Sequence, residues 1–179
     1  EVYDTGTTYW KINSAIALLA MSGADSIKEK VLDILDETTS GGAQVPAKDA
    51  YNAGRIDIRL VPCYKRIANL VFYIERHPDR GFAAGLERLL DDRNISGLKT
   101  NDYSRTRNTL YSANLEILIA AAAGRCGSVK GLDILTGYLE DIHYNFRTFA
   151  RSELASIVKK DCKYDVEAWR KAIMDEDLG

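Results

Sequence analysis

The sequence predicts an all-α domain built from stacked antiparallel helical hairpins. Strand-type alternation of apolar and polar residues is missing, and only three prolines interrupt the 179 residues. Apolar residues recur instead at the spacing of an amphipathic helix. The spacing i, i+3, i+4, i+7, which places side chains on one stripe of a helix, is followed by Ile67, Leu70, Val71 and Ile74.

Turn-forming residues set the expected helix ends. Pro62 suits the first turn of a helix, and Pro78 ends that helix because the residue before a proline disfavours helical backbone angles. Gly124 and Gly127 are expected to break the chain again, and Ser128 can cap the helix that follows. The expected helices span residues 8–22, 26–38, 61–77, 80–92, 107–123, 128–141, 145–159 and 165–174.

These helices form four pairs, each with an apolar helix rich in small residues, a short turn and a second helix. Four pairs in 179 residues give about 45 residues each, a period typical of stacked helical-hairpin repeats. A single hairpin cannot bury its own apolar stripe, so neighbouring hairpins must stack. We therefore expect one domain over residues 1–179, and an irregular helical bundle without true repeats is the alternative.

Composition and motifs exclude several classes of function. The net charge of −2 argues against a general nucleic-acid binder, and no apolar run reaches the length of a membrane span. The odd set of Cys63, Cys126 and Cys162 lacks a C-x-x-C pair and indicates free thiols. Neither a dinucleotide-binding G-x-G-x-x-G, a P-loop nor a G-x-S-x-G is present. The sequence thus predicts no catalytic, cofactor-binding or metal-binding residue, and it leaves the compartment and oligomeric state open.

Two polar segments, residues 38–59 and 94–107, do not fit the hairpins and are expected to be loops. Long loops in compact domains often carry partner or ligand contacts. A solvated loop is the favoured interpretation of each segment, and a partner or ligand contact is the alternative. The candidate contact residues are Tyr51, Arg55, Asp57 and Arg59 in the first segment and Tyr103, Arg105 and Arg107 in the second.

The stretch EDIHYNFRTFARSEL contains a pattern that resembles the HEAT repeat. Its spacing is Asp141-x5-Arg147-x2-Ala150-x3-Leu154. An Asp at such a turn can accept backbone N–H groups, and an Arg can pair with carboxylates across the stack. The small residue permits close helix packing and the Leu fills the core. In the other three units only the apolar and small positions match, so the implied fold, a HEAT-like α-solenoid of about four repeats, depends mainly on this stretch.

The end of the chain also resembles HEAT-like proteins, which often close with a Tyr-Asp-x3-Trp segment. Tyr164, Asp165 and Trp169 have this spacing. The resemblance implies that Trp169 covers the apolar end of the stack, as a terminal cap must.

His143 lies within the HEAT-like stretch and has two interpretations. It is either a metal ligand or base beside Asp141, or a polar residue at a turn between helices. Zinc sites usually need three or four protein ligands, and a helical ligand His usually has a partner at i+4. That position holds Arg147, which repels a cation, so the turn is the favoured interpretation.

Longer stretches look like the helical C-terminal region of secreted bacterial FAD-dependent oxidoreductase-like proteins, also described as xanthan-lyase-like. They are GTTYWKINSAIALLAMSG, YNAGRIDIRLVPCYKRIANLVFYIERHPDRGFAAGLERLL and AAAGRCGSVKGLDILTGYLEDIHYNFRTFARSEL. The resemblance implies an upstream flavin domain that would hold FAD, and a periplasmic or secreted location. None of that domain's phosphate-binding glycines match this chain, so no catalytic residue is carried over. The start at Glu1 rather than Met agrees with a fragment of a longer chain.

The expected function is a non-catalytic interaction or structural domain that packs against an upstream domain of the same protein or another protein. A free-standing scaffold that binds a protein or peptide is one alternative. An α-helical enzyme acting on a polysaccharide is the other, and its candidate residues are Tyr51, Tyr103, Arg105 and His143.

Overall fold

The computed structural model describes residues 25–40, 62–92, 95 and 107–175, and within these residues the chain is all-helical, as the sequence predicts. The elements are α2 (Asp25–Ser40), α4 (Pro62–Arg76), the 3-10 turn η2 (Arg80–Phe82), α5 (Ala83–Asp91), α6 (Arg107–Arg125), α7 (Val129–Tyr138), α8 (Tyr144–Val158) and α9 (Val166–Asp175). The helix expected over residues 8–22 lies outside the described residues. In the part of the chain that is described, no helix is long and apolar enough to cross a membrane.

Most helices begin and end close to the residues that the turn and capping signals predict. Helix α4 begins at Pro62 and ends shortly before Pro78. Ser128 caps α7, because its Oγ accepts a hydrogen bond of 3.1 Å from the Gly131 N–H. Gly124 does not break the chain as expected, since α6 continues through it to Arg125. The turn comes at Gly127 alone, whose φ of 88° is a left-handed conformation that glycine adopts without strain.

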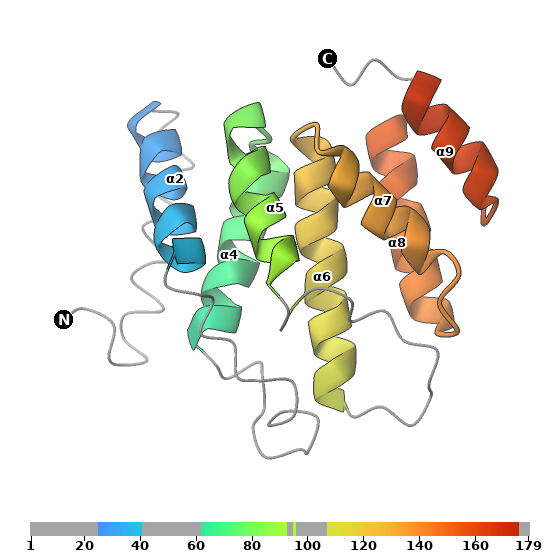
Figure 1. Cartoon of the computed structure of the whole chain (residues 1–179), viewed down its shortest axis with the longest axis horizontal. Coiled ribbons are helices and arrows are strands. Elements are labelled where there is room, and N and C mark those ends of the chain that lie inside the picture. The colour runs from blue at the N-terminus through green and yellow to red at the C-terminus, as the bar shows by residue number, and fades with distance from the viewer. Residues whose placement is uncertain (1–24, 41–61, 93–94, 96–106, 176–179) are drawn as a thin grey trace.

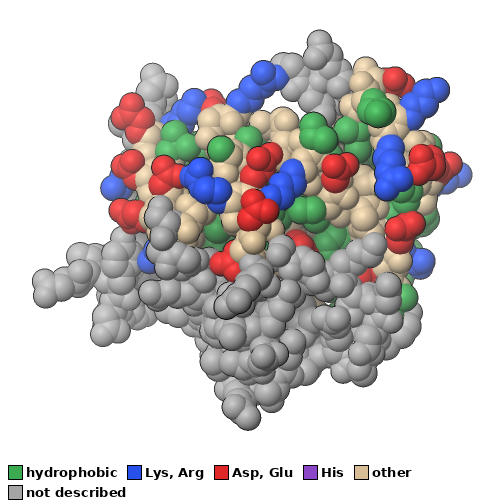
Figure 2. All heavy atoms as spheres, viewed as in Figure 1, with side chains coloured by type: hydrophobic (Ala, Val, Ile, Leu, Met, Phe, Trp, Pro, Cys, Tyr) green, Lys and Arg blue, Asp and Glu red, His purple; other side chains and the backbone are tan. Residues whose placement is uncertain are grey.

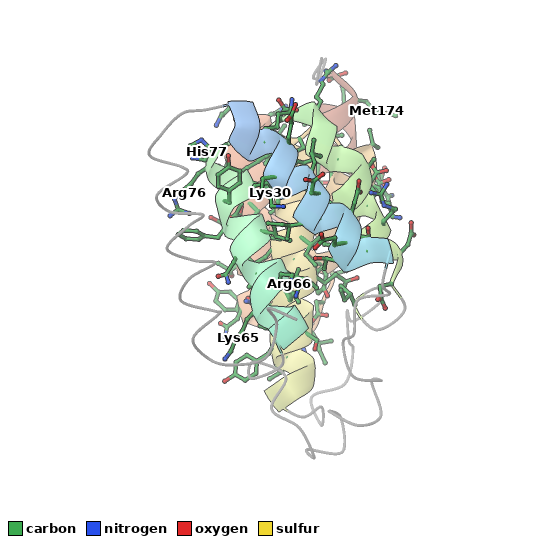
Figure 3. The ribbon with its side chains drawn as sticks, turned by 90° about the vertical axis from the view of Figure 1, so that its left-hand side faces the viewer. Lys30, Lys65, Arg66, Arg76, His77 and Met174 are labelled. Carbon is green, nitrogen blue, oxygen red and sulfur yellow. The ribbon has the colours of Figure 1, made fainter. Side chains whose placement is uncertain are left out.

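The helices form two layers, with α4, α6 and α8 in the far layer of Figure 1 and α2, α5, α7 and α9 in the near layer. Helix α6 lies at the centre, where it packs against α4 and α8 in its own layer and against α5 and α7 in the other. Helix α2 contacts α4 and α5 at one end, and α9 contacts α7 at the other. The side view in Figure 3 also separates α2 from α4 into different layers.

Two glycines allow helices to approach closely, one within a hairpin and one between neighbouring hairpins. A Cβ atom at Gly131 in α7 would lie 2.5 Å from the backbone oxygen of Ala120 in α6. At Gly85 in α5, a Cβ atom would overlap the side chain of Leu35 in α2. At either position a Cβ atom would come closer to its neighbour than van der Waals contact allows. Neither position therefore has room for a side chain unless the neighbour moves.

The hydrophobic core runs along the row between the two layers. In α6 the consecutive residues Ala120, Ala121, Ala122 and Ala123 are all fully buried. Small side chains here let four other helices approach α6. At the far end of the row Trp169 of α9 is also fully buried, and its indole Nε1 donates a hydrogen bond of 2.9 Å to the Lys163 carbonyl oxygen.

Candidate functional site

The candidate contact residues of the two long loops are not placed by the structure. Tyr51, Arg55, Asp57 and Arg59 lie outside the described residues, and so do Tyr103 and Arg105. Arg107 begins α6, but its side chain is likewise outside what is described. The contact role of these residues stays a prediction.

Asp141 and His143 lie together at the start of α8. The Asp141 side chain is fully buried, and its Oδ1 accepts hydrogen bonds from the His143 backbone N–H at 2.8 Å and from the ring Nδ1 at 2.7 Å. His143 is the N-cap residue of α8, and its ring lies 5.4 Å from that of Phe146, centroid to centroid. Asp141 therefore stabilises the start of α8, because its carboxylate binds both the backbone N–H and the ring of His143.

The other residues of the HEAT-like pattern lie in α8, two of them in the core and one beside Tyr164. Ala150 and Leu154 are fully buried. The guanidinium carbon of Arg147 lies 5.7 Å from the centre of the Tyr164 ring, and its buried Nε makes no hydrogen bond. Arg147 thus faces an aromatic ring, whereas the sequence argument paired it with a carboxylate.

A neighbouring ion pair fixes the turn between α8 and α9. Arg151 donates two hydrogen bonds to the Asp161 carboxylate, at 2.9 Å from Nε and 2.5 Å from Nη2. These bonds hold the pKa of Asp161 at about 2. The Tyr164 hydroxyl bonds to Thr148 and lies beside Arg151, which together lower the pKa of Tyr164. We assign this cluster to the stability of the turn, because its charges are already matched within it.

A cavity of about 460 Å³ opens at the edge where α4, α6 and α8 end, and it is the candidate functional site. The far-layer helices run in the same direction, so their C-terminal ends meet there (Figure 1). The lining residues come from the turns after these three helices and from their last turns. They are Glu75, Pro78, Arg80, Gly124, Arg125, Cys126, Gly127, Ser156, Ile157 and Lys159.

Arg125 is part of the cavity wall. Its Nη2 donates a hydrogen bond of 2.5 Å to Oε2 of Glu153, and its Nη1 lies 3.7 Å from Oε1 of Glu75. The side chain is only 20% exposed, and Nη1 is buried without a hydrogen-bond acceptor. The contact with Glu75 is therefore electrostatic only, and the bond to Glu153 is the stronger of the two.

Burial changes the chemistry of two groups in the cavity wall. It raises the pKa of Glu75, an effect that Arg125 opposes and Glu153 reinforces. Burial also raises the pKa of the Cys126 thiol. A thiol with a raised pKa stays protonated and is a poor nucleophile. The Cys126 thiol is therefore not activated for nucleophilic attack.

Periodicity and motif rules do not predict this cavity, but the basic residues at the helix ends point to it. Each far-layer helix has a basic residue at or just after its last turn, namely Arg76, Arg125 and Lys159. Because the three helices belong to successive hairpins, these residues are expected to lie at one edge of the stack. Arg125 lies between Gly124 and Gly127, which capping rules interpret only as chain breakers.

A second surface lies on the outer face of α2 and α4. The Phe72 side chain is 57% exposed, and the guanidinium carbon of Arg76 lies 3.4 Å from the centre of its ring. Figure 3 shows Lys30, Lys65, Arg66 and His77 on the same face. The face seen in Figure 2 is different, because side chains of both signs are intermixed there. Two ion pairs, Arg88–Asp36 and Lys130–Asp91, join helices of the near layer.

Metal binding finds little support in the residues that can be described, where no three His, Cys, Asp or Glu side chains are grouped to hold an ion. Comparisons of the chain with protein-family models, curated proteins and solved structures found no match.

Proposed function

We propose that this chain is a helical-repeat interaction domain whose hairpins stack as a HEAT-like α-solenoid of about four units. The order of contacts supports the stack: α2 packs on α5, α4 on α6, α6 on α8, and α7 on α9. These helices meet the equivalent helix of the next hairpin, which is the arrangement that a linear repeat requires. Between α5 and α7 the contact is made by Lys130, whose ammonium group donates hydrogen bonds to the Glu87 carbonyl oxygen and the Asp91 carboxylate. The close approach at Gly85 adds to this support, because it packs α5 directly on the Leu35 side chain of α2 in the preceding hairpin.

The exposed Phe72 beneath Arg76 is the observation that carries the interaction role. A large aromatic side chain that is more than half exposed leaves apolar area in water, and Arg is enriched with aromatic residues at protein interfaces. Lys30, Lys65 and His77 lie on the same face as Arg76 (Figure 3). A partner that fits this surface presents an apolar pocket for Phe72 and carboxylates around it.

The partner in this proposal is an upstream domain of the same protein. The resemblance to the C-terminal region of FAD-dependent oxidoreductase-like proteins supports that choice and places any flavin in the upstream domain. The chain itself then serves to orient or extend its partner without performing catalysis.

Hydroxyl-radical footprinting tests the docking face directly. The rate of Phe72 labelling is measured in the isolated chain and in the natural protein purified from its own cells. Met174, which is 80% exposed on α9 at the other end of the row, is the internal control. We expect labelling of Phe72 to fall several-fold in the natural protein, while Met174 reacts at the same rate. Equal labelling of Phe72 in both samples would rule this face out as the docking surface.

A further inference from the structure

Two large aromatic side chains are exposed at the start of α8 and in the turn after it, at the end of the row opposite to α2 and α4 (Figure 1). Tyr144 is 64% exposed and Tyr164 is 40% exposed. Thr148 lies one turn after Tyr144 on the same face of α8, and its hydroxyl oxygen is 3.3 Å from that of Tyr164. The two tyrosines therefore border one surface of the last hairpin.

Arg147 lies on this surface, and in the part of the chain that the structure describes no carboxylate pairs with it. It is three residues after Tyr144, and its guanidinium carbon lies 5.7 Å from the centre of the Tyr164 ring. Arg151 is different, because it donates two hydrogen bonds to the Asp161 carboxylate. Arg147 is therefore the cation between the two tyrosines that can still pair with an acid.

The turn between α8 and α9 adds positive charge next to Tyr164. Its residues Lys160 and Lys163 are both exposed. Asp165 also belongs to this turn, but it accepts a hydrogen bond of 2.9 Å from the Ala168 N–H at the start of α9, where the helix dipole favours a negative charge. The surface thus combines exposed aromatic area with cations that lack an acidic partner.

We propose that this surface, formed by the start of α8 and the turn after it, binds an acidic protein segment. A carboxylate of the segment pairs with Arg147, and an apolar side chain packs against Tyr144 and Tyr164. Tyr and Arg are enriched among the residues that contribute most to binding at protein interfaces. The Arg151–Asp161 pair fixes the turn that carries Tyr164, so less conformational entropy is lost on binding.

Capping of the helical stack is the competing explanation for the same residues. A terminal hairpin must present a polar outer surface to water, and Tyr164 then serves only to cover Arg147. In that case acidic peptides bind this surface no better than neutral ones. The docking role of α2 and α4 does not decide between the two explanations, because it concerns the other end of the row.

A peptide titration followed by amide NMR separates the two explanations. The probe is an acetylated pentapeptide with four glutamates around a central phenylalanine, and the neutral analogue has glutamines in place of the glutamates. We expect saturable shifts of the Tyr144, Thr148 and Tyr164 amides at probe concentrations on the order of millimolar. The neutral analogue is expected to bind about tenfold more weakly.

Two matched pairs of variants test the named contacts. Arg147→Gln is expected to weaken binding of the acidic peptide about tenfold, whereas Arg170→Gln, at a site on α9 that is 59% exposed and paired with Glu167, should leave it within about twofold. Tyr144→Ser is expected to weaken binding about fivefold. Its control is Val129→Ser, because Val129 is likewise the first residue of its helix and is 58% exposed.

Three outcomes would overturn the proposal. The first is equal affinity for the acidic and the neutral peptide, or no saturation by either. The second is an equal loss of affinity in the Arg147 and Arg170 variants, which would indicate a general effect of surface charge. The third is a set of saturable shifts confined to α2 and α4, which would place the acidic peptide on the surface around Phe72.

Discussion

The Arg125 guanidinium and the Glu153 carboxylate are joined by a hydrogen bond of 2.5 Å, with the two side chains 20% and 16% exposed. This bond connects the end of α6 to the middle of α8. The same guanidinium faces Glu75 of α4 at 3.7 Å, so one side chain links three successive helices of the far layer. Such partly buried pairs depend strongly on both partners, because a lone charge left behind is poorly solvated.

Replacement of Arg125 by Met should therefore destabilise the fold by about 2 kcal/mol. Two partly buried carboxylates, Glu75 and Glu153, would remain with no cation between them. Arg88→Met is the control, because the Arg88–Asp36 pair is more than half exposed on both sides and such surface pairs contribute less than about 1 kcal/mol. Urea unfolding followed by circular dichroism measures both variants. Equal losses would mean that the Arg125 bridge contributes no more than a surface pair.

Glu75 should make the stability of the fold depend on pH. Burial raises the pKa of its carboxyl group in the folded state above the value in the unfolded chain, against the opposing effects of Arg125 and Arg76 and with the support of Glu153. The folded state therefore binds the proton more tightly. The contribution of Glu75 to stability is fully present below its unfolded pKa and is lost as the pH rises through the folded pKa.

The variant Glu75→Gln tests this linkage, because it keeps the shape of the side chain but cannot ionise. We expect the stability of the variant relative to the original chain to be higher at pH 7 than at pH 4. Thermal unfolding across this pH range gives the comparison. A relative stability that does not change with pH would contradict a raised pKa at Glu75.

Alanine at Gly131 should destabilise the fold by about 1–3 kcal/mol, despite the higher helix propensity of Ala. The new Cβ would meet the Ala120 backbone oxygen at 2.5 Å, and α6 cannot move that atom without distorting the helix. Gly85→Ala meets only the Leu35 side chain. Shortening that side chain in Gly85→Ala/Leu35→Val should recover part of the loss. Denaturant unfolding of the double-mutant cycle measures the coupling, and strict additivity would show that the two residues do not clash.

Asp141→Ala should lower stability by about 1 kcal/mol, the usual effect of losing a side chain that accepts backbone N–H groups at a helix start. The partly buried His143 N–H and ring Nδ1 would both lose the carboxylate oxygen that now accepts from them. Asp141→Asn keeps an acceptor in place and should recover much of the loss, whereas Asp133→Ala, at an exposed site in α7, should have little effect. Loss of a bound metal with an unchanged melting temperature would restore the interpretation of this cluster as a ligand site.

The purified chain should not bind FAD stoichiometrically. The reason is chemical, since the sequence has no glycine-rich turn of the kind that cradles a dinucleotide pyrophosphate. The flavin absorption spectrum, recorded during titration with the chain, measures binding. A spectral shift that saturates at one FAD per chain would place a flavin site in this part of the protein and contradict the proposed division of roles.

Local sequence signals predicted the helices well but the site poorly. The stripe of Ile67, Leu70 and Ile74 and the turn chemistry of Pro62 and Ser128 depend on neighbours within a few residues, so periodicity and capping rules could identify them. The cavity depends on residues 75–80, 124–127 and 156–159, which only the packing of three hairpins brings together.

Arg147 shows the same limit at the level of one side chain. The repeat pattern correctly predicts that Arg147 lies near the start of α8. Its partner, however, is the Tyr164 ring, which belongs to the turn after that helix. The spacing of a sequence pattern predicts on which face of a helix a side chain lies. It does not predict which residue of the following turn packs against that face.

The four consecutive alanines of α6, residues 120–123, have a consequence for the entropy of folding. Alanine has no rotamer freedom to lose, whereas an ordered long side chain loses up to about 2 kcal/mol of it. The helix that contacts four others therefore has, in its C-terminal third, a buried segment that becomes ordered at little side-chain entropic cost. We expect the amide protons of this segment to exchange most slowly with solvent, so that residues 120–123 report the global opening of the fold.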